Sequence, residues 1–109
     1  MSEGLTLDGL AVPLRVLRLL AVDFGHLPAP EIDVSTIYPD RLVLRFHHDL
    51  ADFEAWRDAL GIAPDDVAYR EQSDGRTRVL KAHVEYAGAV LELIGYGDVQ
   101  APVPVGVSV

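Results

Sequence analysis

The sequence lacks cysteine and asparagine, and Lys81 is its only lysine against eight arginines. Without cysteine the chain has no disulfide framework, no thiol nucleophile and no zinc site built from thiolates, which is compatible with a reducing cytoplasm. The scarcity of lysine and asparagine beside abundant alanine, valine, leucine and aspartate is typical of a bacterial genome of high GC content.

The sequence also lacks the segments that direct a chain into or across a membrane. The N-terminal stretch MSEGLTLDGL carries no basic side chain, and the apolar stretch after it contains Arg15 and Arg18. A spanning helix needs about 20 predominantly apolar residues. We therefore predict no signal peptide, no spanning segment and no membrane partner, and we expect the protein in the cytoplasm.

Positive charge is scarce as well: 9 basic residues face 17 acidic ones, and the net charge is −8. Nucleic-acid binders need a basic stripe that displaces counterions from phosphates, so we predict no nucleic-acid partner. Half of the 109 residues are apolar, which is ample for one core. We predict a single α+β domain over residues 1–100 and a flexible Pro/Val tail over 101–109. The alternative for the tail is an extended arm on a neighbouring molecule.

Apolar periodicity predicts the order α-β-β-α-β-β-β. The first helix is expected over residues 13–25, because Pro13 suits a first helical turn and apolar residues recur at helical spacing. The second is expected over residues 49–62, with Asp49 as its N-cap. Its apolar stripe consists of Leu50, Phe53, Trp56 and Leu60.

The first two strands are predicted from two alternations of apolar and polar residues in EIDVSTIYPDRLVLRFH. A turn over residues 38–40 would pair Val34 with Leu44 and would place Asp33 opposite Arg45 on the other face.

Two tight turns, at residues 74–75 and 87–88, connect the last three strands. The pairs predicted from two-residue loops are Tyr69 with Leu80, Ala82 with Leu93 and Val84 with Leu91. Both registers gather apolar residues on one face, namely Val67, Tyr69, Leu80, Ala82, Val84, Tyr86, Leu91 and Leu93. One apolar and one polar face predict a largely antiparallel five-stranded sheet with both helices on the apolar face.

The stretch FHHDL invites a metal-site or catalytic interpretation. Adjacent strand residues point to opposite faces, so His47 and His48 are poorly placed to hold one ion, and Asp49 is explained as a cap. We predict no metal site, no cofactor and no catalytic residue. Gly95 and Gly97 end a strand that no helix follows, which favours a bulge or bend over a phosphate-binding loop.

An alternative site would use His47, Trp56, His83 and Glu92. His83 is expected opposite Glu92 on the polar face, where the pair is an acid/base couple or, more commonly, a cross-strand pair worth about 0.2–1 kcal/mol. Trp56 falls on the apolar stripe of the second helix, where a core position is the default. This alternative predicts a small-ligand-binding or enzymatic domain with its site between the sheet and the second helix.

The segments DLADFEAWRDALGI and GRTRVLKAHVEYAGAVLELIGYGDV, with the proline-containing connector, are similar to a group of small uncharacterised proteins of high-GC Gram-positive bacteria. The resemblance covers roughly residues 13–99. Its motifs are fold signatures rather than chemistry, and it implies an intracellular accessory protein without a known activity, ligand or catalytic residue.

The first helix is apolar nearly all round, whereas a surface helix should be polar on its outer side. The side predicted to cover the sheet holds Leu10, Pro13, Leu14, Leu17, Leu20, Ala21 and Phe24. The outer side, our candidate interface, holds Ala11, Val12, Arg15, Arg18, Leu19 and Val22. We predict a homodimer through this helix, or else contact with an unidentified protein. The leading functional prediction is a non-enzymatic protein-interaction or regulatory accessory module.

Overall fold

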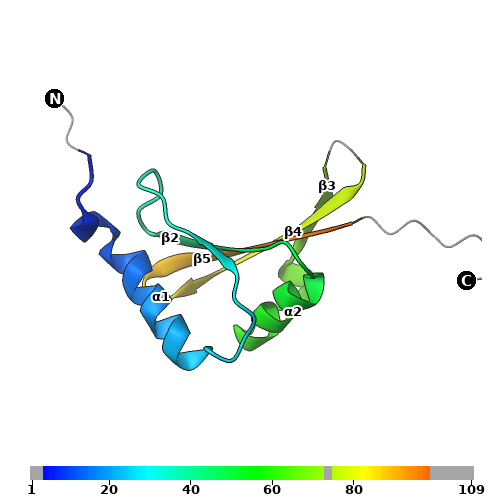
Figure 1. Cartoon of the computed structure of the whole chain (residues 1–109), viewed down its shortest axis with the longest axis horizontal. Helices are drawn as coiled ribbons and strands as arrows, with labels where there is room; N and C mark the ends of the chain where they lie inside the picture. Colours follow the sequence, from blue (N-terminus) through cyan, green and yellow to red (C-terminus); the bar gives the residue numbers. More distant parts are fainter. Residues whose placement is uncertain (1–3, 73–74, 99–109) are drawn as a thin grey trace, which may run out of the picture.

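The computed structural model describes residues 4–72 and 75–98, and there two α-helices pack on one face of a five-stranded sheet (Figure 1). The helices are α1 (Ala11–Asp23) and α2 (Leu50–Ala59). The strands are β1 (Glu31–Asp33), β2 (Arg41–Phe46), β3 (Ala68–Glu71), β4 (Thr77–Tyr86) and β5 (Ala89–Asp98). Two 3-10 turns, η1 (Leu7–Leu10) and η2 (Pro64–Asp66), are additional to the predicted elements. The predicted tail lies outside the described residues.

The sheet is mixed, with the strand order β1-β2-β5-β4-β3. The α+β prediction is confirmed, but the prediction of a largely antiparallel sheet is wrong, because β2 and β5 are parallel neighbours. The cause is α2, which returns the chain across the sheet, so that β3 starts in the same direction as β2. After the turns on either side of β4, β5 runs in this direction as well. It lies next to β2 as the central strand of the sheet.

The two registers predicted for the β3–β4–β5 meander are confirmed. Tyr69 pairs with Leu80, and Val84 pairs with Leu91. The turn between β4 and β5 has positive φ at Ala87 (50°) and Gly88 (91°), as a two-residue hairpin turn that follows the sheet twist requires.

The register predicted for the first hairpin is wrong by two residues. Ile32, not Val34, lies opposite Leu44, because the connection between β1 and β2 is longer than the predicted three-residue turn. A shift of two residues keeps every side chain on its face, so Arg45 still reaches Asp33, with Nη1 2.8 Å from Oδ2.

The core lies between the sheet and the two helices. α1 contributes Val16 and Leu20, and α2 contributes Phe53 and Trp56, all of them buried. The sheet contributes Leu42, Leu44, Phe46, Ala82, Ala89, Leu91 and Leu93. Tyr69, which the meander pattern placed with these residues, is exposed instead.

Gly95 and Gly97 lie in a regular part of β5 rather than at the predicted bulge or bend, since the pairing with β4 continues through both. Their missing side chains let α2 approach the strand. A Cβ at Gly95 would lie 2.9 Å from Leu50 Cδ2 and 3.0 Å from Phe53 Cβ. These glycines therefore set the distance between α2 and the sheet, and with it the position of the junction at which α2 begins.

Candidate functional site

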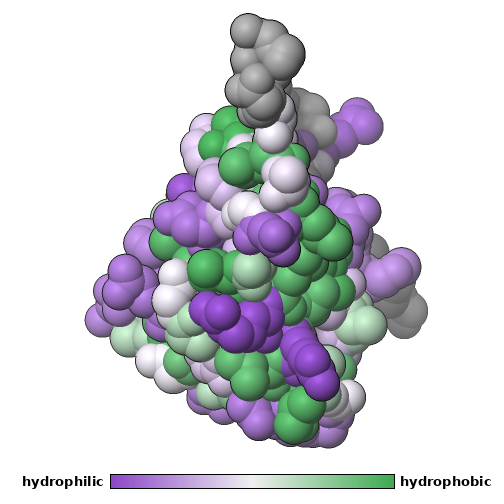
Figure 2. Space-filling view, turned by 90° about the vertical axis from the view of Figure 1, so that its left-hand side faces the viewer, coloured by the Kyte–Doolittle hydropathy of each residue, from purple (hydrophilic) through white to green (hydrophobic). Residues whose placement is uncertain are grey.

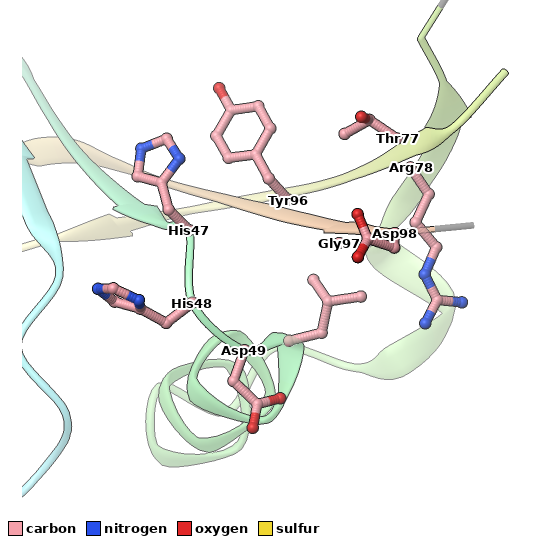
Figure 3. A pocket seen from close by; sticks show the side chains of 9 residues that line it. His47, His48, Asp49, Thr77, Arg78, Tyr96, Gly97 and Asp98 are labelled. Atoms are coloured by element: carbon pink, nitrogen blue, oxygen red, sulfur yellow. The ribbon is translucent and has the colours of Figure 1, made fainter. Parts of the chain in front are cut away.

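The FHHDL junction connects the end of β2 to the start of α2. Asp49 is extended (φ −152°) and its Oδ1 accepts a hydrogen bond from the Ala51 N–H at 2.9 Å, so the predicted N-cap is confirmed. His47 lies on the sheet face opposite the helices, with Nε2 3.1 Å from Glu31 Oε1 and its ring stacked on Tyr96 at 4.8 Å. The His48 ring points in a different direction from the His47 ring (Figure 3). The two histidines therefore do not converge on one point.

A recess of about 290 Å³ lies beside this junction. It is lined by His47, His48, Asp49, Leu50, Thr77, Arg78, Tyr96, Gly97 and Asp98. His47 and Tyr96 point to one side of the strands, whereas Asp49 and Arg78 point to the other (Figure 3). The Arg78 Nε is buried, and its N–H donates to no acceptor among the described residues. The lining of the recess thus contains one arginine, Arg78, and it does not bring a nucleophile and a base together.

Sequence reasoning did not identify Arg78, although a signal was present. The alternation that turns Leu80 and Ala82 toward the helices also turns Arg78 toward them, and a charged residue at such a position is unusual. In the part of the chain that the structure describes, no three histidine or acidic residues are close enough to hold a metal ion.

The four residues of the alternative site are not brought together. His83 pairs with Glu92 across β4 and β5, as predicted, but the ion-pair partner of Glu92 is Arg41, with Nη1 3.8 Å from Oε1. Trp56 lies in the core on the other face of the sheet, where its Nε1–H donates to the Pro28 carbonyl at 2.8 Å. The space between the sheet and α2 is filled by core side chains.

The sheet face away from the helices is a network of paired charges around a small apolar cluster. Val43, Val79 and Ile94 are buried there and Tyr96 packs against them, a cluster that the predicted polar face did not include. The hydrogen bond to Asp33 raises the pKa of Arg45 above its ordinary value, and the Tyr96 hydroxyl contributes in the same direction against the effect of burial. Arg41 and Arg45 each have a carboxylate partner on this face, although the Arg41 Nε is buried without a hydrogen-bond partner among the described residues.

The outer side of α1 is more apolar than the solvent-facing side of an ordinary surface helix. Of the candidate interface, five residues are exposed, namely Ala11, Arg15, Arg18, Leu19 and Val22. Val12 is instead half-buried against the core, so less of its side chain is available to an interface. The helix is rotated from the predicted orientation: Val16 faces the sheet, whereas Leu14 and Ala21 are exposed. The side of α1 that is buried against the sheet consists of Pro13, Val16 and Leu20.

Apolar and charged side chains adjoin on this side of the molecule (Figure 2). Val22 is 76% exposed and Leu7, in η1, is 73% exposed. Arg15 and Arg18 form no ion pair with any described residue. Beside α1 lies an apolar groove of about 190 Å³, which we call the connector groove because residues 24–30 form one wall. It is lined by Leu17, Leu20, Ala21, Phe24, Gly25, Leu27, Pro28, Ala29, Pro30, Ile32, Leu44 and Trp56.

Neither described helix has the length and apolar composition needed to cross a bilayer. Comparison of the chain with protein-family models, curated proteins and solved structures gives no match. The similarity to small proteins of high-GC Gram-positive bacteria therefore stays a prediction, and function has to be argued from the surface itself.

Proposed function

We propose that the protein is a non-enzymatic interaction module that associates with a second copy of itself through the outer side of α1. The observation that carries the proposal is the exposure of Leu14, Leu19 and Val22 on one helix, with Leu7 just before it. An amphipathic helix on a sheet needs only one apolar side, and exposed apolar patches beyond a few hundred Å² mark interaction surfaces. A two-fold contact covers the same surface on both copies.

The size of the surface sets the expected strength of the association. The 13 residues of α1 span about 20 Å at ~1.5 Å per residue. A pair of such helices buries less than the roughly 1,600 Å² of a standard interface, so we expect a weak, concentration-dependent dimer. The net charge of −8 disfavours nucleic acid as the partner of this surface. A cytoplasmic location stays a prediction from the sequence.

A charge placed on the outer side of α1 tests the proposal. Val22→Glu should convert the dimer to a monomer in light scattering, because the carboxylate would be desolvated against apolar side chains. Ile37→Glu is a matched control, since Ile37 and Val22 are both 76% exposed and Ile37 lies in the β1–β2 connection. A Val22→Glu protein that still dimerises like the Ile37→Glu protein contradicts the proposal.

The recess at the FHHDL junction supports a second candidate, the binding of a small anion. The observation that favours it is the buried, unpartnered Nε of Arg78 next to the start of α2. The carboxylates of Asp49 and Asp98 line the same recess and oppose an anion electrostatically. Self-association is the stronger candidate because it needs no ligand to overcome this repulsion.

A further inference from the structure

The charges along α1 are arranged to distinguish between the two ways in which a pair of these helices can align. Arg15 and Arg18 lie in the middle of the helix and Asp23 at its end. A parallel pair would place each arginine beside the same arginine of the other copy, which is repulsive. An antiparallel pair brings the middle of one helix toward the end of the other, where a carboxylate is available.

The positions fit a two-fold axis at Leu19. Arg15 comes four residues before Leu19 and Asp23 four residues after it, so each is about 6 Å from the axis along the helix at ~1.5 Å per residue. In an antiparallel pair Arg15 of each copy therefore lies opposite Asp23 of the other, which gives two such contacts. Asp23 has capacity for the contact, because Tyr86 donates only to its Oδ2, at 3.3 Å, and a carboxylate accepts several hydrogen bonds.

The same three residues also share one side of the helix. Arg15 and Asp23 lie only about 40° around the helix from Leu19, since four residues make slightly more than one turn of ~3.6 residues. Leu19 is 38% exposed, so this side is open to a second copy. Position along the axis and direction around it thus point to one alignment.

We infer that two copies of the chain pair their α1 helices antiparallel about Leu19, with Arg15 of each copy beside Asp23 of the other. The inference rests on the proposed self-association and specifies its geometry. The occupant of the outer side of α1 is therefore a second copy in one defined register.

Charge reversal tests this register. Arg15→Glu and Asp23→Arg should each raise the dimer dissociation constant about tenfold, since each replaces two attractions by two repulsions. The double variant restores the attraction with the signs exchanged and should return the constant to within about threefold of the wild-type value. Arg70→Glu makes the same change of net charge on the exposed edge strand β3 and should leave the constant unchanged. Tyr86→Phe should also leave it unchanged, which separates the Asp23 charge from its contact with the tyrosine.

Cross-linking provides the second measurement, and the cysteine-free sequence makes it unambiguous. A mixture of Arg15→Cys and Asp23→Cys chains should form a covalent dimer with a short bismaleimide, whereas neither variant alone should. Cross-linking of Arg15→Cys to itself indicates a parallel pair and overturns the inference. A dimer that Val22→Glu disrupts but that the double charge reversal does not rescue also overturns the register and leaves self-association standing. A wild-type chain that does not dimerise overturns both.

Discussion

Gly95→Ala is the substitution whose effect the structure predicts most directly. A methyl group at this position would lie 2.9 Å from Leu50 Cδ2 and 3.0 Å from both Phe53 Cβ and Phe53 Cδ2. Carbon atoms prefer separations of about 3.5–4.0 Å, so something has to move. Phe53 Cβ is attached to the helix backbone and the Phe53 side chain is fully buried, so the movement has to come from α2 itself.

The expected cost follows from two opposing terms. Overpacking a core typically costs about 1–3 kcal/mol. Replacing glycine by alanine also restricts the unfolded chain, which raises the free energy of unfolding by about 0.4–1 kcal/mol. We therefore expect Gly95→Ala to lower the free energy of unfolding by roughly 1.3 kcal/mol, the difference between the midpoints of these ranges, and by at most about 2.6 kcal/mol.

Gly97→Ala is the matched control. Its methyl group would lie 2.6 Å from Leu50 Cδ1 and 2.9 Å from Leu50 Cγ, atoms of one half-buried side chain that can rotate away. The free energy of unfolding should then change by less than about 1 kcal/mol. Urea denaturation followed by circular dichroism, at one protein concentration, measures both variants. A Gly95→Ala protein as stable as the wild type, or less affected than Gly97→Ala, refutes the close approach of α2.

Two further predictions concern the core and the recess. Leu93→Ala should lower the free energy of unfolding by about 2–5 kcal/mol because Leu93 is fully buried, and Leu80→Ala should cost less because Leu80 is half-buried; equal denaturation midpoints would show that the meander register does not determine the core. If the second candidate function holds, inorganic phosphate should cause saturable NMR shifts of the amides of residues 49–51 and 77–78, and Arg78→Gln should abolish them. Shifts that grow linearly with phosphate, or that persist in Arg78→Gln, remove that candidate.

The local features of the fold could be predicted because short-range chemistry determines them. Ala87 and Gly88 form a two-residue turn that fixes the β4–β5 register, and the Asp49 side chain caps α2 within two residues of itself. The position of β5 beside β2 could not be predicted in this way, because turn chemistry gives no information about which strands meet across a helical connection. The register of β1 could not be predicted either, because the connection between β1 and β2 is longer than the predicted turn. The alternation of faces along β1 was still predicted correctly.

The candidate site was predictable only in part. Periodicity identified α1 as too apolar for a surface helix, but it placed Leu14 toward the sheet and left Val16 unassigned, because nearly every position of the helix is apolar. Only packing decides which apolar side faces inward. The predicted register places Glu31 opposite His47, and this contact forms although the observed register is shifted by two residues. The connector groove could not be predicted, because it depends on the path of residues 24–30.

Sedimentation equilibrium of the unmodified chain, from micromolar to millimolar concentration, tests the central claim most directly. One chain has a mass of 11.9 kDa. Self-association through α1 predicts that the weight-average mass rises with concentration toward twice that value and no further, since a two-fold contact closes on itself. A mass that stays at 11.9 kDa across the whole range contradicts the claim.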